Sequence, residues 1–65
     1  MKEYILRNYT IQFDMYNKPV YAFGQVFNNP KFKDGSLVRT SEIKEYIPNE
    51  KIITLNSTYI LENNA

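Results

Sequence analysis

The sequence contains no cysteine, no histidine and no tryptophan in its 65 residues. Without Cys the chain forms no disulfide, and without Cys and His it lacks the side chains from which zinc sites are usually built. The acidic residues also lack the regular spacing of a calcium-binding loop. The sequence therefore predicts a domain with no metal site, no cofactor and no covalent cross-link.

The same absences bear on catalysis. Ser36, Thr40 and Ser41 would need a Lys or a carboxylate as activating base, and no motif places one beside them. Asp34 and Glu42 lie next to turn signals, where isolated acids usually hold the backbone rather than exchange protons. We therefore expect no enzymatic activity and no catalytic residue.

An excess of one charge and a long apolar run are absent as well. Eight basic residues and seven acidic residues give a net charge of +1, which creates little attraction to nucleic acid or to anionic lipid. The first ten residues, MKEYILRNYT, contain no apolar run that could serve as a signal peptide or cross a bilayer. A cytoplasmic protein without a membrane partner is the expectation.

Aromatic residues, in contrast, are frequent. The chain is long enough for a single small domain, residues 1–65, which buries only about 60% of the surface of the unfolded chain. Six Tyr and four Phe supply most of the bulk for its core. Six tyrosines cannot all lie inside so small a domain, and exposed Tyr is favoured at protein interfaces. Some of them are therefore candidates for contact with a partner.

Alternating polarity predicts strands in the first half of the chain. The segment YTIQFDMY, residues 9–16, alternates with a period of two and predicts a half-buried strand. Residues 3–6 either begin the same strand or form a separate one, with a bend or bulge at Arg7 and Asn8. Residues 17–19 predict a turn, and residues 19–27 predict the second strand of a hairpin.

The second strand is apolar on both faces. One face carries Val20, Ala22 and Val26, and the other carries Tyr21, Phe23 and Phe27. Either both faces are covered by the protein itself, or one face meets a partner. This strand and the small size of the chain suggest a homodimer. Gly24, in the middle of the strand, predicts a bulge or a bend.

The second half of the chain predicts shorter strands. Residues 36–47 form a third strand whose apolar positions change parity at Thr40 and Ser41, as a bulge or a strand end would require. A short helix over residues 41–47 is the alternative. Residues 52–55 and 58–61 predict a closing hairpin, and residues 62–65 a frayed end. The predicted fold class is all-β: a small curled antiparallel sheet or partly open barrel of about five strands.

The loop NNPKFKDG, residues 28–35, has two interpretations. Phe32 could stack on a nucleic-acid base while Lys31 and Lys33 meet phosphates, as in single-strand binders. Alternatively Phe32 turns inward and plugs the end of the barrel, and the lysines are its solvated neighbours. The second interpretation is favoured because Asp34 follows at once and the chain is nearly neutral. Asp34 and Gly35 are expected to fix the turn, and the hydroxyls of residues 40 and 41 to bond to backbone.

The order of turn and strand residues also resembles a known pattern. It comprises Gly24-Gln-Val26, Pro30-Lys-Phe32-Lys-Asp34-Gly35, Val38-Arg-Thr40-Ser41-Glu-Ile43, Ile53-Thr54 and Tyr59-Ile-Leu61. The segment resembles short proteins of phages and bacterial mobile elements, which often carry His and Arg where this chain has Asn29 and Lys31. The resemblance implies no reaction. It implies a context, because small phage proteins without catalytic residues commonly occlude a host protein, including components of antiviral defence such as CRISPR-Cas.

These observations lead to one principal hypothesis. The protein is expected to be a non-catalytic binding protein of the host cytoplasm that associates with itself and inhibits a host protein. The alternatives are a small barrel that binds single-stranded nucleic acid and a component of a virion or its assembly. The candidate partner-binding residues are Lys31, Phe32, Lys33, Arg39, Tyr21 and Phe23.

Overall fold

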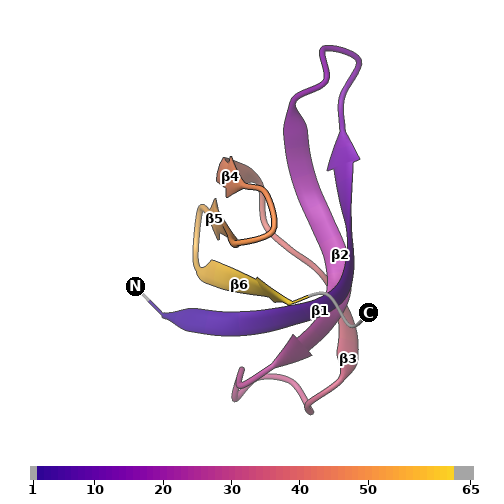
Figure 1. Cartoon of the computed structure of the whole chain (residues 1–65). Helices are drawn as coiled ribbons and strands as arrows, with labels where there is room; N and C mark the ends of the chain where they lie inside the picture. Colours follow the sequence, from indigo (N-terminus) through magenta and orange to yellow (C-terminus); the bar gives the residue numbers. More distant parts are fainter. Residues whose placement is uncertain (1, 63–65) are drawn as a thin grey trace.

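The computed structural model describes residues 2–62, which form strands and turns and contain no helix. The strands are β1 (Glu3–Phe13), β2 (Pro19–Phe27), β3 (Ser36–Arg39), β4 (Ile43–Ile47), β5 (Lys51–Thr54) and β6 (Thr58–Glu62). They form one curled sheet in the order β3-β2-β1-β6-β5-β4 (Figure 1). The all-β prediction is confirmed, with six strands in place of about five.

The sheet is mixed, whereas the sequence predicts antiparallel pairing only. β1 and β6 run parallel, with Tyr4 beside Tyr59 and Leu6 beside Leu61, and all other neighbours are antiparallel. Alternating polarity is the same for both kinds of pairing, so it cannot distinguish them. β3 and β4 remain as the two edges, and the sheet does not close into a barrel.

β1 is one long strand with an irregularity in its middle. Its register with β2 shifts between Arg7 and Thr10, and Asn8 has a φ of 51°. The strand changes direction sharply along its length (Figure 1). The first predicted alternative, a continuous strand with a bulge, is therefore confirmed. Gly24 of β2 faces this bulge, and a Cβ atom there would lie 3.0 Å from the Arg7 carbonyl oxygen.

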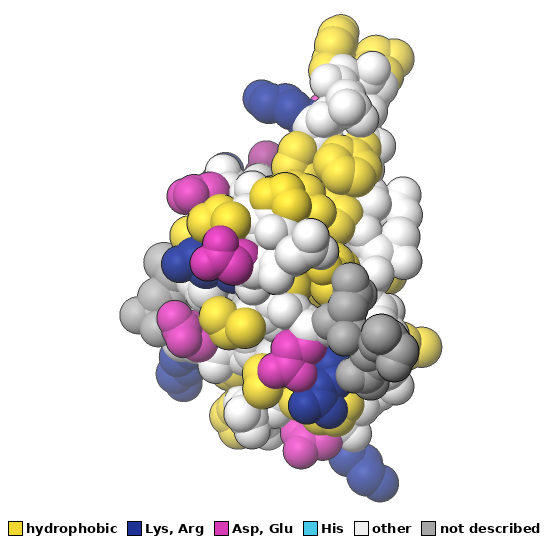
Figure 2. All heavy atoms as spheres, in the orientation of Figure 1, with side chains coloured by type: hydrophobic (Ala, Val, Ile, Leu, Met, Phe, Trp, Pro, Cys, Tyr) yellow, Lys and Arg dark blue, Asp and Glu magenta, His cyan; other side chains and the backbone are white. Residues whose placement is uncertain are grey.

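The β1–β2 hairpin projects beyond the rest of the sheet. β6 pairs only with Glu3–Arg7 of β1, so the outer half of the hairpin is a two-stranded ribbon (Figure 1). The Asp14 carboxylate holds the turn by accepting from the backbone N–H groups of Tyr16 and Lys18. Met15 and Tyr16, at the tip, are 87% and 79% exposed. Hydrophobic side chains gather at this end of the molecule (Figure 2).

Residues 36–47 form two strands rather than one, and the predicted parity change at Thr40 and Ser41 is a strand end. The Thr40 hydroxyl accepts a hydrogen bond from the Ala22 N–H at 3.0 Å and donates one to the Ser41 carbonyl at 2.9 Å. These bonds confirm the backbone role expected for Thr40. The alternative of a short helix over residues 41–47 is wrong, because β4 pairs with β5 there.

The last three strands form two tight hairpins, of which the sequence predicts the closing one, β5 with β6. Asn49, with a φ of 63°, lies in the first turn, and the Thr54 hydroxyl bonds to the backbone of the second. The expectation of a frayed end is wrong at Glu62, which belongs to β6 and accepts from the Arg7 guanidinium at 2.7 Å. Residues 63–65 lie outside the described part of the chain.

The core lies inside the curl of the sheet. Its buried hydrophobic members are Tyr4, Leu6, Ala22, Val26, Ile43, Ile52, Tyr59 and Leu61. Two tyrosines are thus buried while others stay at the surface, as the sequence predicts. Over residues 2–62 there is no helix long and apolar enough to cross a membrane.

Candidate functional site

The loop over residues 28–35 is held by its own polar groups. The side chain of the buried Asn29 accepts from the Lys31 N–H at 3.0 Å, and its carbonyl accepts from the Phe32 N–H at 3.0 Å. The Asp34 carboxylate accepts from the Asn28 N–H at 3.1 Å, and Gly35 has a φ of 90°. The structural roles predicted for Asp34 and Gly35 are therefore confirmed.

The favoured interpretation of Phe32 as an inward plug is wrong. Its side chain is 45% exposed. The interior beside the loop is already filled by Tyr4 and Tyr59, whose ring centroids lie 5.8 Å apart. Phe32 instead lines a shallow cleft of about 230 Å³, here called the loop cleft. Its lining residues are Tyr4, Asn29, Lys31, Phe32, Val38, Arg39, Ser41, Asn56, Ser57 and Tyr59.

The charged residues that line the loop cleft are all basic. Lys31 and Arg39 lie on its wall, and no Asp or Glu does. Asp34, in the same loop, is engaged with the Asn28 N–H and holds the turn. Lys33 is exposed but does not line the cleft. The cleft therefore favours a negatively charged group, and an exposed aromatic ring stands at its wall.

Arg39 connects the loop cleft to the outer face of β2. Its guanidinium carbon lies 5.1 Å from the Tyr21 ring centroid, within range of a cation–π contact. The Tyr21 and Phe23 rings meet edge to face at 5.4 Å, and Phe23 is 43% exposed. Five of the six predicted contact residues thus lie on one continuous surface, here called the Arg39 patch: Tyr21, Phe23, Lys31, Phe32 and Arg39.

Sequence reasoning missed Leu37, which is 81% exposed. It pairs with Gln25 on β2, as Arg39 pairs with Phe23, so both side chains of β3 lie on the outer face of the sheet. The signal was present in the alternation of SLVR, which separates Leu37 and Arg39 from Val38. Leu37 extends the apolar part of the Arg39 patch toward the sheet edge.

Burial governs the chemistry at the floor of the loop cleft. Desolvation raises the pKa of Tyr59 above its ordinary value of 10.0, and the charge of the neighbouring Tyr4 adds to the effect. The Tyr59 phenol therefore remains a neutral donor and acceptor at physiological pH. On the rim, the Asn56 side-chain amide donates to the Ser41 hydroxyl at 2.8 Å and fixes both groups.

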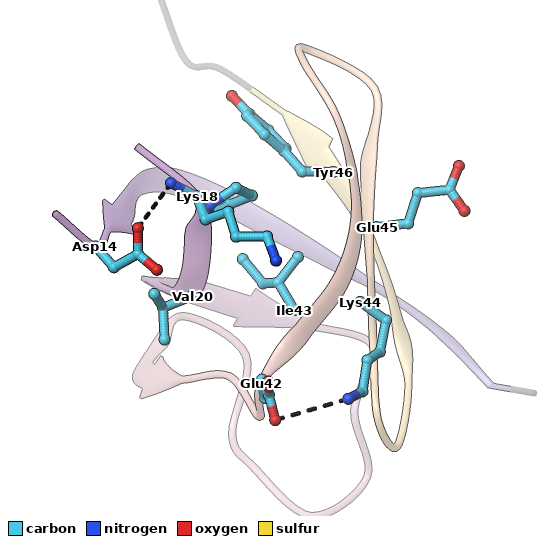
Figure 3. A pocket seen from close by; sticks show the side chains of 9 residues that line it. Asp14, Lys18, Val20, Glu42, Ile43, Lys44, Glu45 and Tyr46 are labelled. Carbon is cyan, nitrogen blue, oxygen red and sulfur yellow. Dashed lines mark hydrogen bonds and ion pairs between the residues drawn. The ribbon is translucent and has the colours of Figure 1, made fainter. Parts of the chain in front are cut away.

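A second, larger cleft of about 440 Å³ lies where the sheet stays open, between the β1–β2 hairpin and β4 (Figure 3). Its lining residues are Asp14, Lys18, Pro19, Val20, Glu42, Ile43, Lys44, Glu45 and Tyr46. Charges of both signs occur here, and Lys44 and Glu42 pair with each other at 3.7 Å. This cleft thus has no single charge preference, in contrast to the loop cleft.

Neither a metal site nor a similar known protein points to a function for the described residues. Within residues 2–62, no group of three or more acidic, Cys or His side chains is placed to hold a metal ion. Comparison with protein-family models, with curated proteins and with solved structures found no match to the chain. The function must therefore be argued from the Arg39 patch itself.

Proposed function

We propose that this chain is a non-catalytic binding protein that acts by protein–protein interaction through the Arg39 patch. The observation that carries the proposal is the position of Arg39, which joins the basic loop cleft to the half-buried Tyr21 and the exposed Phe23. Tyr, Phe and Arg are enriched in the centres of protein interfaces, where they contribute large contact areas and charge-assisted hydrogen bonds.

The charge of the patch defines the partner surface. Lys31 and Arg39 lie on it, and among residues 2–62 no carboxylate lines the loop cleft. An acidic surface on the partner would therefore lie against the cations of Lys31 and Arg39. Such charge complementarity increases the rate of association and the specificity of binding more than the affinity. The aromatic pair beside Arg39 then provides the apolar contact area.

Single-stranded nucleic acid is the second candidate, favoured by one observation. Phe32 is exposed at the wall of a cleft that also holds Lys31 and Arg39. However, three cations, with Lys33 included, would give a salt-dependence slope of only about −2, against values several-fold larger for strong binders. A protein partner therefore fits the patch better.

The resemblance to phage and mobile-element proteins supplies the proposed setting. The partner would be a bacterial host protein, in particular a component of antiviral defence such as CRISPR-Cas, and binding would occlude its working surface. The protein would act in the host cytoplasm. This part of the proposal comes from the pattern of residues 24–61 and not from the geometry of the patch.

Affinity capture with matched charge variants tests the proposal. Arg39→Glu changes the patch, whereas Lys18→Glu makes the same charge change on the exposed hairpin turn. We expect a host protein that is retained by the unaltered chain and by Lys18→Glu, and is lost with Arg39→Glu. Loss with both variants, or with neither, would contradict the role of the patch. In parallel, a gel shift in low salt with oligo(dT) and oligo(U) distinguishes the nucleic-acid candidate.

Inhibition of defence has its own assay. The chain is expressed in bacteria whose CRISPR-Cas system targets an infecting phage, and plating efficiency is counted. We expect the unaltered chain and Lys18→Glu to restore plating, and Arg39→Glu to fail. If capture of a host protein depends on Arg39 but plating does not change, the Arg39 patch still binds a host protein, and CRISPR-Cas is excluded as its target.

A further inference from the structure

The two edges of the sheet differ in how they are protected. β4 is interrupted by a register shift between Ile43 and Glu45, and it carries the exposed ion pair of Lys44 with Glu42. The β1–β2 hairpin faces it across the larger cleft (Figure 3). Bulges, charged side chains and covering segments are the features by which natural sheets prevent unwanted pairing at an edge.

β3 is less protected, and its one charged side chain is Arg39 on the outer face of the sheet. Its four residues, SLVR, contain no Pro, no Lys and no acidic residue, and its register with β2 shows no shift. Leu37, the most exposed apolar side chain of the strand, lies on the outer face beside Gln25. An edge strand of this composition is open to pairing with another strand.

The backbone of β3 also points the required groups outward. The Thr40 N–H donates to the Ala22 carbonyl at 2.8 Å, which fixes the phase of the antiparallel ladder. Because hydrogen-bonded and non-bonded pairs alternate, Val38 bonds to Gly24 in the same phase. The N–H and C=O groups of Leu37 and Arg39 then face away from β2. Two donors and two acceptors are thus directed at the open edge.

We propose that β3 receives an extended acidic segment of the partner protein as an additional strand of the sheet. This inference rests on the proposed function, because it uses the same patch. The backbone of the partner pairs with Leu37 and Arg39, as in other cases of strand addition. A carboxylate of the added strand lies opposite Arg39, and an apolar side chain lies opposite Leu37.

Charge argues for a foreign acidic segment rather than a second copy of β3. Pairing two β3 strands would place two Arg39 residues and two basic loop clefts together, with no carboxylate from either strand. Val38 and Arg39 also line the loop cleft, so the added strand runs along its wall. A carboxylate in it can therefore reach Lys31 as well as Arg39.

The probe for the test is a short fluorescein-labelled peptide in which Glu and Val stand two residues apart with Thr between them, so that both lie on one face of an extended strand. It is matched with a peptide in which Lys replaces Glu. We expect the Glu peptide to bind the full chain and the Lys peptide not to bind. In NMR amide exchange, the Glu peptide should slow the N–H groups of Leu37 and Arg39, while Val38 stays unchanged. This alternation is specific to strand addition, because contact through side chains alone would not produce it.

Substitutions at Leu37 and Arg39 distinguish backbone pairing at the β3 edge from side-chain contacts with the Arg39 patch. Leu37→Pro removes an outward N–H together with the Leu side chain, and we expect it to abolish peptide binding. Leu37→Ala removes the side chain alone and should weaken binding by about tenfold or less. Arg39→Glu should reverse the preference toward the Lys peptide. If Leu37→Pro does not fold, the exchange pattern of the unaltered chain decides.

Three outcomes would overturn the inference. They are failure of the Glu peptide to bind, binding without slower exchange at Leu37 and Arg39, and binding of oligo(dT) at the same residues in place of the peptide. If host-protein capture still depends on Arg39 in the second case, the proposed function stands and only strand addition is lost.

Discussion

At the scale of single residues, the bend in β1 depends on the absence of a side chain at Gly24. A Cβ atom there would lie 2.9 Å from the Leu6 Cγ atom and 3.1 Å from the Tyr9 Cα atom. No left-handed backbone angle is involved, so close approach alone explains the glycine. The bulge in β1 brings the backbones of β1 and β2 close together, and the glycine at position 24 of β2 makes that approach possible.

Gly24→Ala should therefore destabilise the protein by about 1–3 kcal/mol, as overpacking of a tight site usually does. The free energy of unfolding from denaturant titration measures the effect. Thr10→Ala, at an exposed position of β1, is the control and should stay within about 0.5 kcal/mol. An unchanged midpoint for Gly24→Ala would mean that β1 can move away from β2 at no cost.

Two tyrosine phenols predict a fall in stability at alkaline pH. The pKa values of Tyr59 and Tyr9 are raised mainly by desolvation, so the folded state keeps these protons longer than the unfolded state. Below the ordinary value of 10.0 this contribution is fully present, and it decreases as the pH rises above that value. Tyr59→Phe should reduce the alkaline loss of thermal stability. Tyr16→Phe, at the exposed hairpin tip, should follow the unaltered protein.

At the scale of elements, local sequence patterns predicted where the strands lie better than they predicted how the strands pair. β2 was predicted with its observed bounds, because Pro19 follows a turn residue and the apolar run stops at Asn28. The parallel β1–β6 pair was not predictable, since it joins residues far apart in the chain. The direction of Phe32 depends on Tyr4 and Tyr59 already filling the interior, which no property of the loop sequence reveals.

The junction between β3 and β4 gives an element-scale prediction. The buried Thr40 hydroxyl accepts from the Ala22 N–H, so Thr40→Val leaves that donor without its partner and should cost about 1–3 kcal/mol. Thr40→Ser keeps the hydroxyl and should recover most of the loss. Chemical denaturation measures both. Destabilisation by Ser but not by Val would assign the effect to the methyl group rather than to the hydrogen bond.

At the scale of the whole molecule, the homodimer remains a prediction, and the structure suggests where it would form. The core covers Ala22 and Val26, so the inner face of β2 needs no partner. The projecting hairpin does expose Met15 and Tyr16, and a two-stranded ribbon is marginally stable by itself in water. Contact between two hairpins would bury these side chains.

Light scattering at high micromolar concentration should then return the mass of two chains. The double substitution Met15→Ser, Tyr16→Ser should return the mass of one. Leu55→Ser, which removes an exposed apolar side chain away from the hairpin, is the control and should leave the dimer intact. A strictly monomeric mass for the unaltered chain would exclude the dimer but would not affect the Arg39 patch.

The unequal protection of the two sheet edges also limits how copies can assemble. Open-ended cross-β fibrils require that each copy accept a strand at one edge and offer one at the other. In the proposed strand addition β3 accepts a strand, whereas the bulge and the charges of β4 disfavour its use as the donor. Sheet growth therefore stops after one addition, and concentrated solutions should give no thioflavin-positive fibres. A chain with one open edge can bind a foreign strand without a tendency to polymerise.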